Sequence, residues 1–308
     1  LLSASLDLVV LFIALEIMSI AVYVLVGFRR TDVKSNEASI KYFVLGSAAS
    51  AIFLFGVALV YGSAGTMNIV QLGQFLRTLN GSVNPMLYLG ALLLVVGFLF
   101  KVAAAPFHMW MPDVYEGAPT AVTNFMTTGL KAAAFGAFLR VFMALELGDN
   151  FTPVLNSSMH HILWIVAILT MFIGNVIALT QRNIKRMLAY SSIAHTGYII
   201  VGFIAGGHSE YGFASVLVYL VGYVVMNIGA FAVVALIGER GDRNTEIQDY
   251  SGIGFKYPLL GFAMAVFMFS MAGIPPTVGF AGKYLIFSSA VAAGEIWLSV
   301  LAVLCSAI

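Results

Sequence analysis

The chain has 308 residues, of which 61% are hydrophobic and 9% are charged, and its mean hydropathy is +0.98. Soluble domains run nearer to half apolar and a quarter charged, so this composition excludes an ordinary soluble protein and indicates a polytopic membrane protein. The net charge of +1 says nothing about nucleic acid, and no basic, aromatic-interleaved segment supports nucleic-acid binding. A single cysteine, Cys305, excludes a cysteine-held iron–sulfur cluster, a CxxC redox pair or a cysteine-type zinc site within the chain.

Apolar runs of about 20 residues, the length that crosses about 30 Å of hydrocarbon, recur along the whole chain. We therefore expect an all-α, polytopic transmembrane helix bundle with about nine crossings and a single membrane domain over residues 1–308. The chain opens on Leu1 and both ends are apolar, so we expect a piece of a longer protein. The runs cover residues 3–27, 39–61, 85–105, 120–145, 161–180, 187–206, 212–238, 257–293 and 295 to the end.

The first run carries a carboxylate, Glu16, about 13 residues from its start. At 1.5 Å per residue this position is about 20 Å along the helix, near the middle of the membrane. An ionisable group there costs about 2.5–3.5 kcal/mol on insertion scales, so it usually faces a bundle interior or a hydrated path. We predict a role in proton transport with a lysine that keeps Glu16 ionised; the alternative is a protonated carboxyl bound to a neighbouring helix.

The run that reaches Lys101 is interrupted by Pro106 and Pro112. Proline removes a helical hydrogen bond, and in lipid the freed carbonyl groups need partners inside the protein or beside a hydrated cavity. We therefore predict a discontinuous helix at this position, with Lys101 as a proton carrier. The alternative is that Lys101 anchors the helix by reaching toward the interface.

Two ionisable residues follow in the middle of the chain. Lys131 lies about 11 residues into its run, among small residues that leave room for water or another helix. His195 lies in a hydroxyl-rich segment, Tyr190–Tyr198, and its ordinary titration range suits a proton relay. The alternatives are a helix-locking ion pair for Lys131 and a helix-to-helix hydrogen bond for His195. The other membrane histidines, His160, His161 and His208, are expected near the interface.

The run 257–293 is interrupted at Gly273, Pro275 and Pro276, and Lys283 follows seven residues after the second proline. Paired broken helices in the two halves of a transporter point to an inverted internal repeat and its ion path. We predict a first repeat-like half over 1–150 and a second over 151–308. Lys283 is expected to pass protons toward one aqueous face.

Basic residues in the links are unevenly divided between the two sides of the predicted membrane. Ten fall on the side where the first helix ends, side A, and two on the opposite side, so side A is predicted to be cytoplasmic. The side A residues are Arg29, Arg30, Lys34, Lys41, Arg182, Lys185, Arg186, Arg240, Arg243 and Lys256, and the others are Arg77 and Arg140. His108, Asp113 and Glu116 are expected to order the turn after Lys101, and no cluster has the ligand spacing of a metal site.

Three segments carry a family resemblance. They begin at Lys101 (KVAAAPFHMWMPDVYEGAPT), Asn183 (NIKRMLAYSSIAHTGY) and Met271 (MAGIPPTVGFAGK). They resemble the antiporter-like membrane subunits of respiratory complex I, the NADH-quinone oxidoreductase, over essentially the whole chain. The residues of the first segment distinguish the chain from sister subunits of that complex and from related cation/proton antiporters.

The resemblance implies roles for the buried charges. Glu16 and Lys101 match the family's charge pair, Lys131 its connecting lysine, and Lys283 the lysine of its second broken helix. The family moves protons while other subunits reduce quinone, which implies no cofactor in this chain, with NADH, flavin, iron–sulfur clusters and quinone in partner subunits. The expected partners are other membrane subunits of complex I and the lipid bilayer, in a bacterial inner membrane or, alternatively, an organelle membrane.

These observations predict an electrostatic proton relay. When Glu16 is close, Lys101 holds its proton, and when Glu16 moves away, Lys101 releases the proton toward Lys131. From Lys131 the proton passes by way of His195 to Lys283. One alternative is a subunit of a sodium/proton antiporter, and another is a non-pumping scaffold whose buried charges lock helices. A quinone-binding role is weaker, because the aromatic and methionine-rich segments are better explained as packing or lipid-facing surface.

Overall fold

The structure is a computed structural model that describes residues 1–79, 84–146, 153–206, 209, 211–238 and 242–308, without the side chains from 144 to 158. Two residues assigned above, His208 and Arg240, lie outside the described residues. The predicted boundary between the halves at residue 150 does so as well.

The described chain folds into helices, as predicted for an all-α bundle. Six of the described helices are long and apolar enough to cross a membrane: α1, α2, α4, α8 over Met159–Ala178, α9 and α10. The expected crossings over 120–145 and 257–293 are divided into shorter helices, because a π-helical turn interrupts the first and glycine and proline interrupt the second. The run that starts at residue 295 forms one shorter apolar helix. The bounds are η1 Leu2–Ala4, α1 Leu8–Val26, α2 Val33–Ala64, α3 Ile69–Thr78, α4 Pro85–Val102, α5 Trp110–Gly117, α6 Thr120–Phe125, the π-helical turn η2 Met126–Leu130, α7 Lys131–Glu146, α8 Pro153–Ala178, α9 Ile184–Gly206, α10 Gly212–Ile237, η3 Ile247–Tyr250, α11 Ile253–Lys256, α12 Pro258–Ala272, α13 Val278–Ala292 and α14 Ile296–Ala307.

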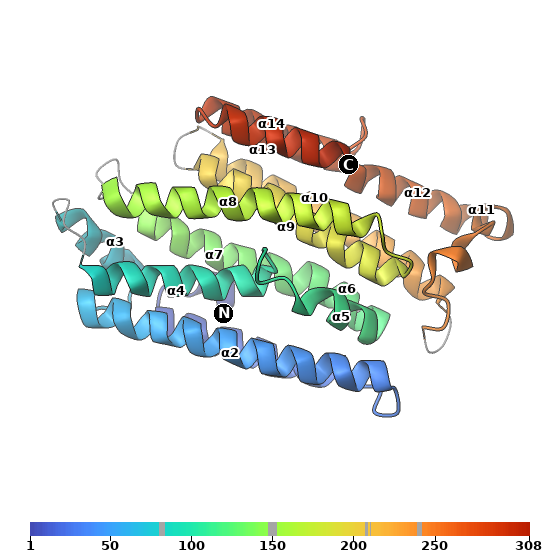
Figure 1. Ribbon diagram of the computed structural model, residues 1–308, viewed down its shortest axis with the longest axis horizontal. Coiled ribbons are helices and arrows are strands. Elements are labelled where there is room, and N and C mark those ends of the chain that lie inside the picture. The colour runs from blue at the N-terminus through green and yellow to red at the C-terminus, as the bar shows by residue number, and fades with distance from the viewer. Residues whose placement is uncertain (80–83, 147–152, 207–208, 210, 239–241) are drawn as a thin grey trace.

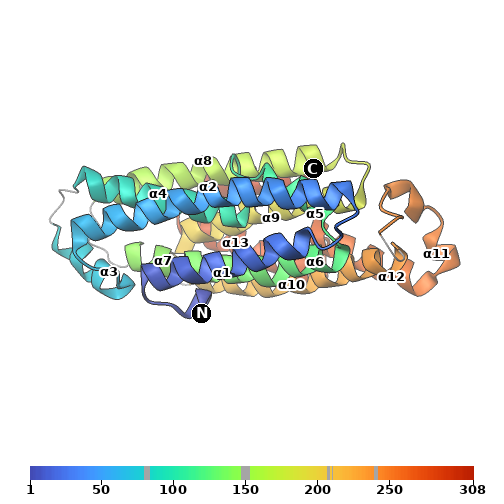
Figure 2. The ribbon, with the colours of Figure 1, turned by 90° about the horizontal axis from the view of Figure 1, so that it is seen from below.

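The long helices run roughly parallel, so the bundle is elongated and has two ends (Figures 1 and 2). One end carries α3, and the other carries α5, α11 and the start of α2. Helix α9 lies inside the bundle, and 83% of its membrane-length window is buried, against at most 61% for the other five long helices. Since α9 carries His195, the fold places this histidine in the protein interior.

Local sequence explains where the helices begin and end. Asp7 starts α1 by accepting hydrogen bonds from the backbone N–H groups of Val9 and Val10. Pro85 occupies the first turn of α4, where its missing N–H costs nothing. Helix α2 ends at Gly65, whose φ of 68° is left-handed and favours glycine.

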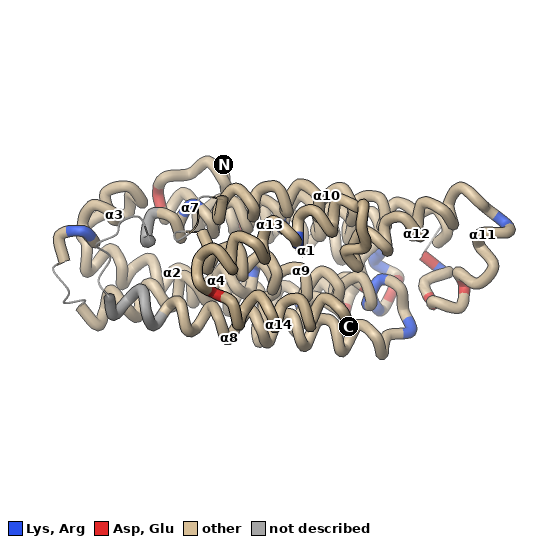
Figure 3. The backbone as a smooth tube through the Cα atoms, turned by 90° about the horizontal axis from the view of Figure 1, so that it is seen from above, with Lys and Arg blue, Asp and Glu red and all other residues tan. Residues whose placement is uncertain are grey.

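The described basic residues of side A gather at one end of the bundle. Figure 3 shows most of the lysine and arginine positions near the start of α2, α11 and the loops beside them. Helix α2 has 32 residues and is therefore about 48 Å long, which exceeds the hydrocarbon thickness. Its first turns, with Lys34 and Lys41, extend beyond the apolar region and meet acidic residues of α5.

Candidate functional site

Two apolar clusters fill the bundle, one toward the α3 end and one toward the α5 end. On α1 the first cluster ends at Leu15 and the second begins at Val22, and on α9 the change falls between Ile193 and Ala194. Polar side chains occupy this boundary on several helices, and we call them the central polar layer. Its members are Glu16, Ser19, Ser50, Lys101, Thr127, Lys131, Ser192, His195, Tyr219, Tyr223 and Lys283.

The layer begins with Glu16 on α1 and Lys101 in the last turn of α4. Ser50 of α2 donates a hydrogen bond to the Glu16 carboxylate. The Lys101 ammonium donates to the Ser19 hydroxyl at 2.6 Å, and that hydroxyl donates to the Leu15 carbonyl oxygen at 2.5 Å. Among the described ion pairs, which extend to 4 Å, none joins Glu16 to Lys101. The two predicted partners are neighbours in the fold, but each binds a different serine.

Small cavities lie beside three charges of the layer. Glu16 and Lys101 line one cavity together with Ser50, and Lys101 and Lys131 line a second one. Each has a volume of about 10 Å³, close to what one water molecule needs. The interior therefore has room for about one water on each side of Lys101.

Lys131 lies directly after the π-helical turn η2, a feature that is frequent at functional sites. Lys131 is 2% exposed. Its ammonium donates to the carbonyl oxygen and to the hydroxyl of Ser192, both at 2.7 Å. The Ser192 hydroxyl lies 2.6 Å from the Tyr223 hydroxyl, which in turn lies 2.9 Å from that of Thr127. Lys131 is thus joined to a buried chain of three hydroxyl groups.

His195 and Lys283 continue the layer toward α13. The Nδ1 atom of His195 lies 2.5 Å from the Tyr219 hydroxyl, and its ring packs edge-on against Tyr198. The Lys283 ammonium lies 4.9 Å from the centre of the Tyr198 ring. It donates to the carbonyl oxygen of Ala272 at 2.9 Å and to the Ser306 hydroxyl at 2.7 Å. Tyr198 therefore lies between the histidine and the last lysine.

Backbone groups freed where α4 ends find partners inside the bundle. Thr196 of α9 donates to the carbonyl oxygen of Val102 at 2.9 Å, and Thr170 of α8 accepts from the N–H of Ala105 at 2.9 Å. The indole of Trp110 donates to the carbonyl oxygen of Phe100 at 3.0 Å. These bonds meet the requirement that irregular backbone at membrane depth be satisfied by protein.

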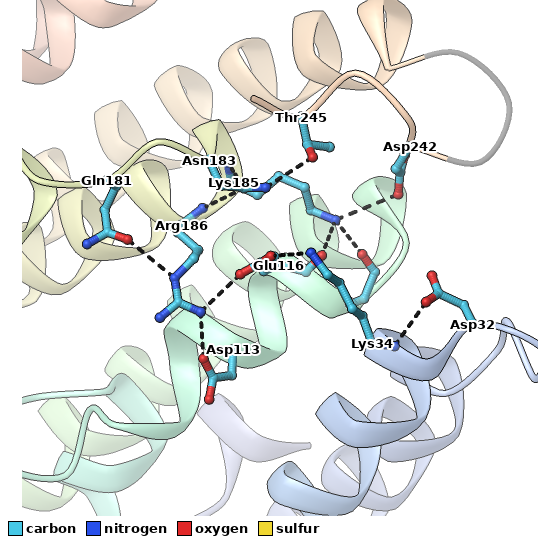
Figure 4. Close-up of polar contacts among 11 residues, drawn as sticks. Asp32, Lys34, Asp113, Glu116, Gln181, Asn183, Lys185, Arg186, Asp242 and Thr245 are labelled. Atoms are coloured by element: carbon cyan, nitrogen blue, oxygen red, sulfur yellow. Dashed lines mark hydrogen bonds and ion pairs between the residues drawn. The ribbon is translucent and has the colours of Figure 1, made fainter. Parts of the chain in front are cut away.

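The basic end holds a cluster of ion pairs around Asp113 and Glu116 of α5 (Figure 4). Arg186 binds Asp113 at 2.6 Å and Glu116 at 3.0 Å, and Lys34 binds Glu116 at 2.8 Å. Burial raises the pKa of each carboxyl, but hydrogen bonds and charges from Arg186 and the neighbouring lysines outweigh it, so both pKa values lie below their ordinary range. This cluster orders the segment after Lys101, as predicted for Asp113 and Glu116.

Lys185, at the start of α9, is as buried as Lys131 but has different partners. It donates to the backbone carbonyl oxygens of Glu116 at 3.0 Å and Ala118 at 2.5 Å, and its ammonium lies 3.7 Å from the Asp242 carboxylate. Asp242 also accepts from the Thr120 N–H. These acceptors join α9 to the end of α5 and to the loop after α10. Among the described residues, no group of three His, Cys, Asp or Glu side chains is placed to hold a metal ion.

The sequence model of one protein family, described as NADH:quinone oxidoreductase/Mrp antiporter, TM, matches residues 5–308. The chain belongs to this family. It is a multi-pass membrane protein of the antiporter-like type, as the three sequence segments predicted.

Individual relatives and solved structures show which members of the family the chain is similar to. The chain is 52% identical over 307 residues to NADH-quinone oxidoreductase subunit N of Trichlorobacter lovleyi, which covers all of this chain and 61% of that protein. Respiratory complex I from Thermus thermophilus with bound aureothin contains a chain with 40% identity and a TM-score of 0.83, matched over 100% of this chain and 64% of that one. A chain of the Mrp complex from Dietzia sp. has 27% identity and a TM-score of 0.84 over 97% of this chain and 54% of that one. The chain thus spans about three fifths of the length of the subunit N relative.

The fold brings all five predicted relay residues of this family member into one layer, although their roles remain predictions. Sequence reasoning missed the serines that bind Glu16 and the three lysines. For Ser19 a signal existed, because it lies three residues after Glu16 and hence on the same face of α1. Ser50 and Ser306 lie on other helices, so helix packing alone reveals them.

Proposed function

We propose that the chain acts as an antiporter-like membrane subunit of a NADH-quinone oxidoreductase and moves protons while partner subunits reduce quinone. The observation that carries the proposal is the central polar layer, in which one carboxylate, three lysines and a histidine lie between two apolar clusters. Charges that only hold helices together need no cavities beside them, yet two cavities flank Lys101. Identity of 52% to a subunit N supports the same assignment.

The first step of the proposed path is electrostatic. At an effective dielectric near 20, opposite unit charges about 4 Å apart attract by roughly 4 kcal/mol, so an approach of Glu16 to Lys101 favours the protonated lysine. The structure has the two side chains on separate serines, which corresponds to the separated state. In this state Lys101 gives its proton through the shared cavity to Lys131.

The second part of the path runs from Lys131 along the hydroxyl chain of Ser192 and Tyr223. His195 receives the proton beside Tyr219, and water bridges the interval to Lys283. Lys283 also lines a large, mostly apolar groove between α13 and α14, together with Ser306. Release toward one aqueous face from this lysine completes the proposed path.

We also infer two discontinuous membrane helices, one formed by α4 with α5 and one by α12 with α13. Both α4 and α12 end in a left-handed residue, Ala103 and Gly273, and both ends bear a lysine ammonium. Lys101 lies in the last turn of α4, and Lys283 binds the Ala272 carbonyl at the end of α12. A cation is stabilised at a helix C-terminus, so the correspondence supports an inverted repeat of halves 1–150 and 151–308.

The proposed location is a bacterial inner membrane, among other membrane subunits of complex I. NADH, flavin, iron–sulfur clusters and quinone are assigned to partner subunits. A second candidate, a sodium/proton antiporter subunit, is supported by the likeness to the Mrp complex chain. Dependence of transport on sodium at constant pH distinguishes the two, because the proposed oxidoreductase subunit needs none.

Two buried lysines offer a matched test of the function against a scaffold role. Lys131, in the layer, is 2% exposed, and Lys185, at the basic end, is 1% exposed. In the full-length subunit within its complex, Lys131→Ala is expected to abolish proton pumping per assembled complex. Lys185→Ala is expected to reduce assembly without lowering pumping per assembled complex. Wild-type pumping with Lys131→Ala would support the scaffold alternative instead.

A further inference from the structure

Each lysine of the central polar layer, and its glutamate, shares a hydrogen bond with a serine hydroxyl from another helix. The serines belong to α1, α2, α9 and α14, and Ser19 and Ser192 are almost fully buried. The pairs are Ser50 with Glu16, Ser19 with Lys101, Ser192 with Lys131, and Ser306 with Lys283. The recurrence on four separate helices indicates a common requirement.

A hydroxyl group suits a partner that changes its protonation state. It has one O–H donor and two acceptor lone pairs, whereas a carboxylate or a carbonyl oxygen only accepts. A serine therefore accepts from a lysine ammonium and, after its hydrogen turns, donates to the neutral amine. Neither state leaves a buried polar group without a partner, which would be unfavourable.

Lys185 supplies the contrast within the same chain. Its partners are two backbone carbonyl oxygens and the Asp242 carboxylate, all of which only accept. After loss of its proton, the two remaining N–H groups would serve only two of these three acceptors, and the lone pair of the neutral amine would face no donor. This buried lysine outside the layer thus has a set of partners without a hydroxyl group, unlike the three lysines of the layer.

We propose that Ser19, Ser192 and Ser306 are positioning residues that hold the three lysines in place through both gain and loss of a proton. The proposal rests on the proposed function. When Lys101 gives its proton to the next group of the path, the N–H···O bond to Ser19 becomes an O–H···N bond. No heavy atom need move, and the ammonium returns to the same place when a proton arrives. The titratable groups around Lys101 and Ser19 are Glu16 and Tyr23 on α1, Tyr42 on α2, Tyr115 on α5 and Lys131 on α7.

Substitutions of Ser19 in the full-length subunit test the proposal, with proton pumping and electron transfer from NADH to quinone measured per assembled complex. Ser19→Ala is expected to lower both by at least about tenfold, because a charge-assisted hydrogen bond is lost. Ser19→Thr, which keeps a hydroxyl, is expected to stay within about twofold of wild type. Ser19→Asp binds the ammonium but cannot donate when ionised, so it is expected to trap the proton and stop pumping.

Ser39→Ala is the matched control, because Ser39 donates to the backbone carbonyl of Tyr23 and contacts no lysine of the layer. It is expected to pump at the wild-type rate. Wild-type pumping by Ser19→Ala or Ser19→Asp, alongside a loss in Lys101→Ala, would overturn the serine role and leave the proposed function intact. Wild-type pumping by Lys101→Ala would instead overturn the function. If Ser19→Ala does not assemble, the partly exposed Ser306 is substituted by alanine instead. A fall in proton pumping by Ser306→Ala would support the positioning role of the serines, and wild-type pumping would overturn it.

Discussion

Lys101 binds Ser19, which lies one helical turn along α1 from Glu16, the carboxylate that the same lysine would pair with. Glu16 and Lys101 line one small cavity, and in the proposed relay a change in the Lys101 rotamer or in α1 exchanges the serine for the carboxylate. The proposed relay thus requires Lys101 to alternate between two partners within one site.

Removing the charge of Glu16 is expected to weaken the first step of the path. Glu16→Gln keeps a group that accepts from Ser50, but it lacks the negative charge that attracts the Lys101 ammonium. Pumping per assembled complex should fall at least about tenfold, since the lost attraction is of the order of several kcal/mol. Glu37→Gln, at an exposed carboxylate that pairs with Lys41, serves as the control and should pump normally.

The ion pairs at the basic end should differ in their effect on stability. Arg186 joins both carboxylates of α5, and its side chain is 28% exposed, whereas the side chain of Lys34 is 69% exposed. Arg186→Ala is expected to lower the free energy of unfolding by about 1–3 kcal/mol and Lys34→Ala by less than about 1 kcal/mol. Thermal unfolding of the detergent-solubilised, full-length subunit measures both, and an equal shift would contradict the assignment.

The same cluster predicts a loss of stability in acid. The pKa values of Asp113 and Glu116 lie below their ordinary 3.8 and 4.5, so these carboxylates stabilise the fold above those ordinary values. This stabilisation is lost as the pH falls through the lower pKa values of the folded state. The melting temperature should therefore fall when the pH is lowered below about 4. This fall should be smaller in Arg186→Ala, because its carboxylates are less stabilised in the folded state. An unchanged drop in that variant would argue against the cluster as its origin.

Much of this architecture follows from the sequence. Apolar runs give the long helices, and the excess of basic residues on one side agrees with the gathering of the described ones at one end. The prolines after Lys101 and before Lys283 mark where α4 and α12 end. Each of these signals is local, because helix length and helix breaks depend on neighbouring residues.

Other features depend on packing between distant segments. The span expected over 120–145 contains a π-helical turn just before Lys131, which local propensity does not specify. Ser50 meets Glu16, and Ser306 meets Lys283, across helices that are far apart in the sequence or separated by a loop. The family resemblance leads us to expect Glu16 and Lys101 as a charge pair, whereas in the structure each of them binds a serine. Such partners are set by which faces of two helices meet.

A glycine controls how closely the two parts of the second broken helix approach. A Cβ atom at Gly279 of α13 would clash with the backbone carbonyl oxygen of Ser270 in α12, and backbone cannot easily move aside. Gly279→Ala is expected to destabilise the subunit by about 3 kcal/mol or more and to reduce assembly. Gly254→Ala, where a Cβ meets open space, should assemble normally. Equal melting temperatures for the two variants would contradict the close approach.

The most direct test of the relay measures proton pumping and NADH-to-quinone electron transfer side by side for Lys101→Ala in the full-length subunit, normalised to assembled complex. Lys101 is 9% exposed and stands between Glu16 and Lys131 in the proposed path. The relay predicts that both rates fall together while assembly stays intact. If both rates persist at wild-type levels, the buried charge is structural and the chain does not carry protons through Lys101.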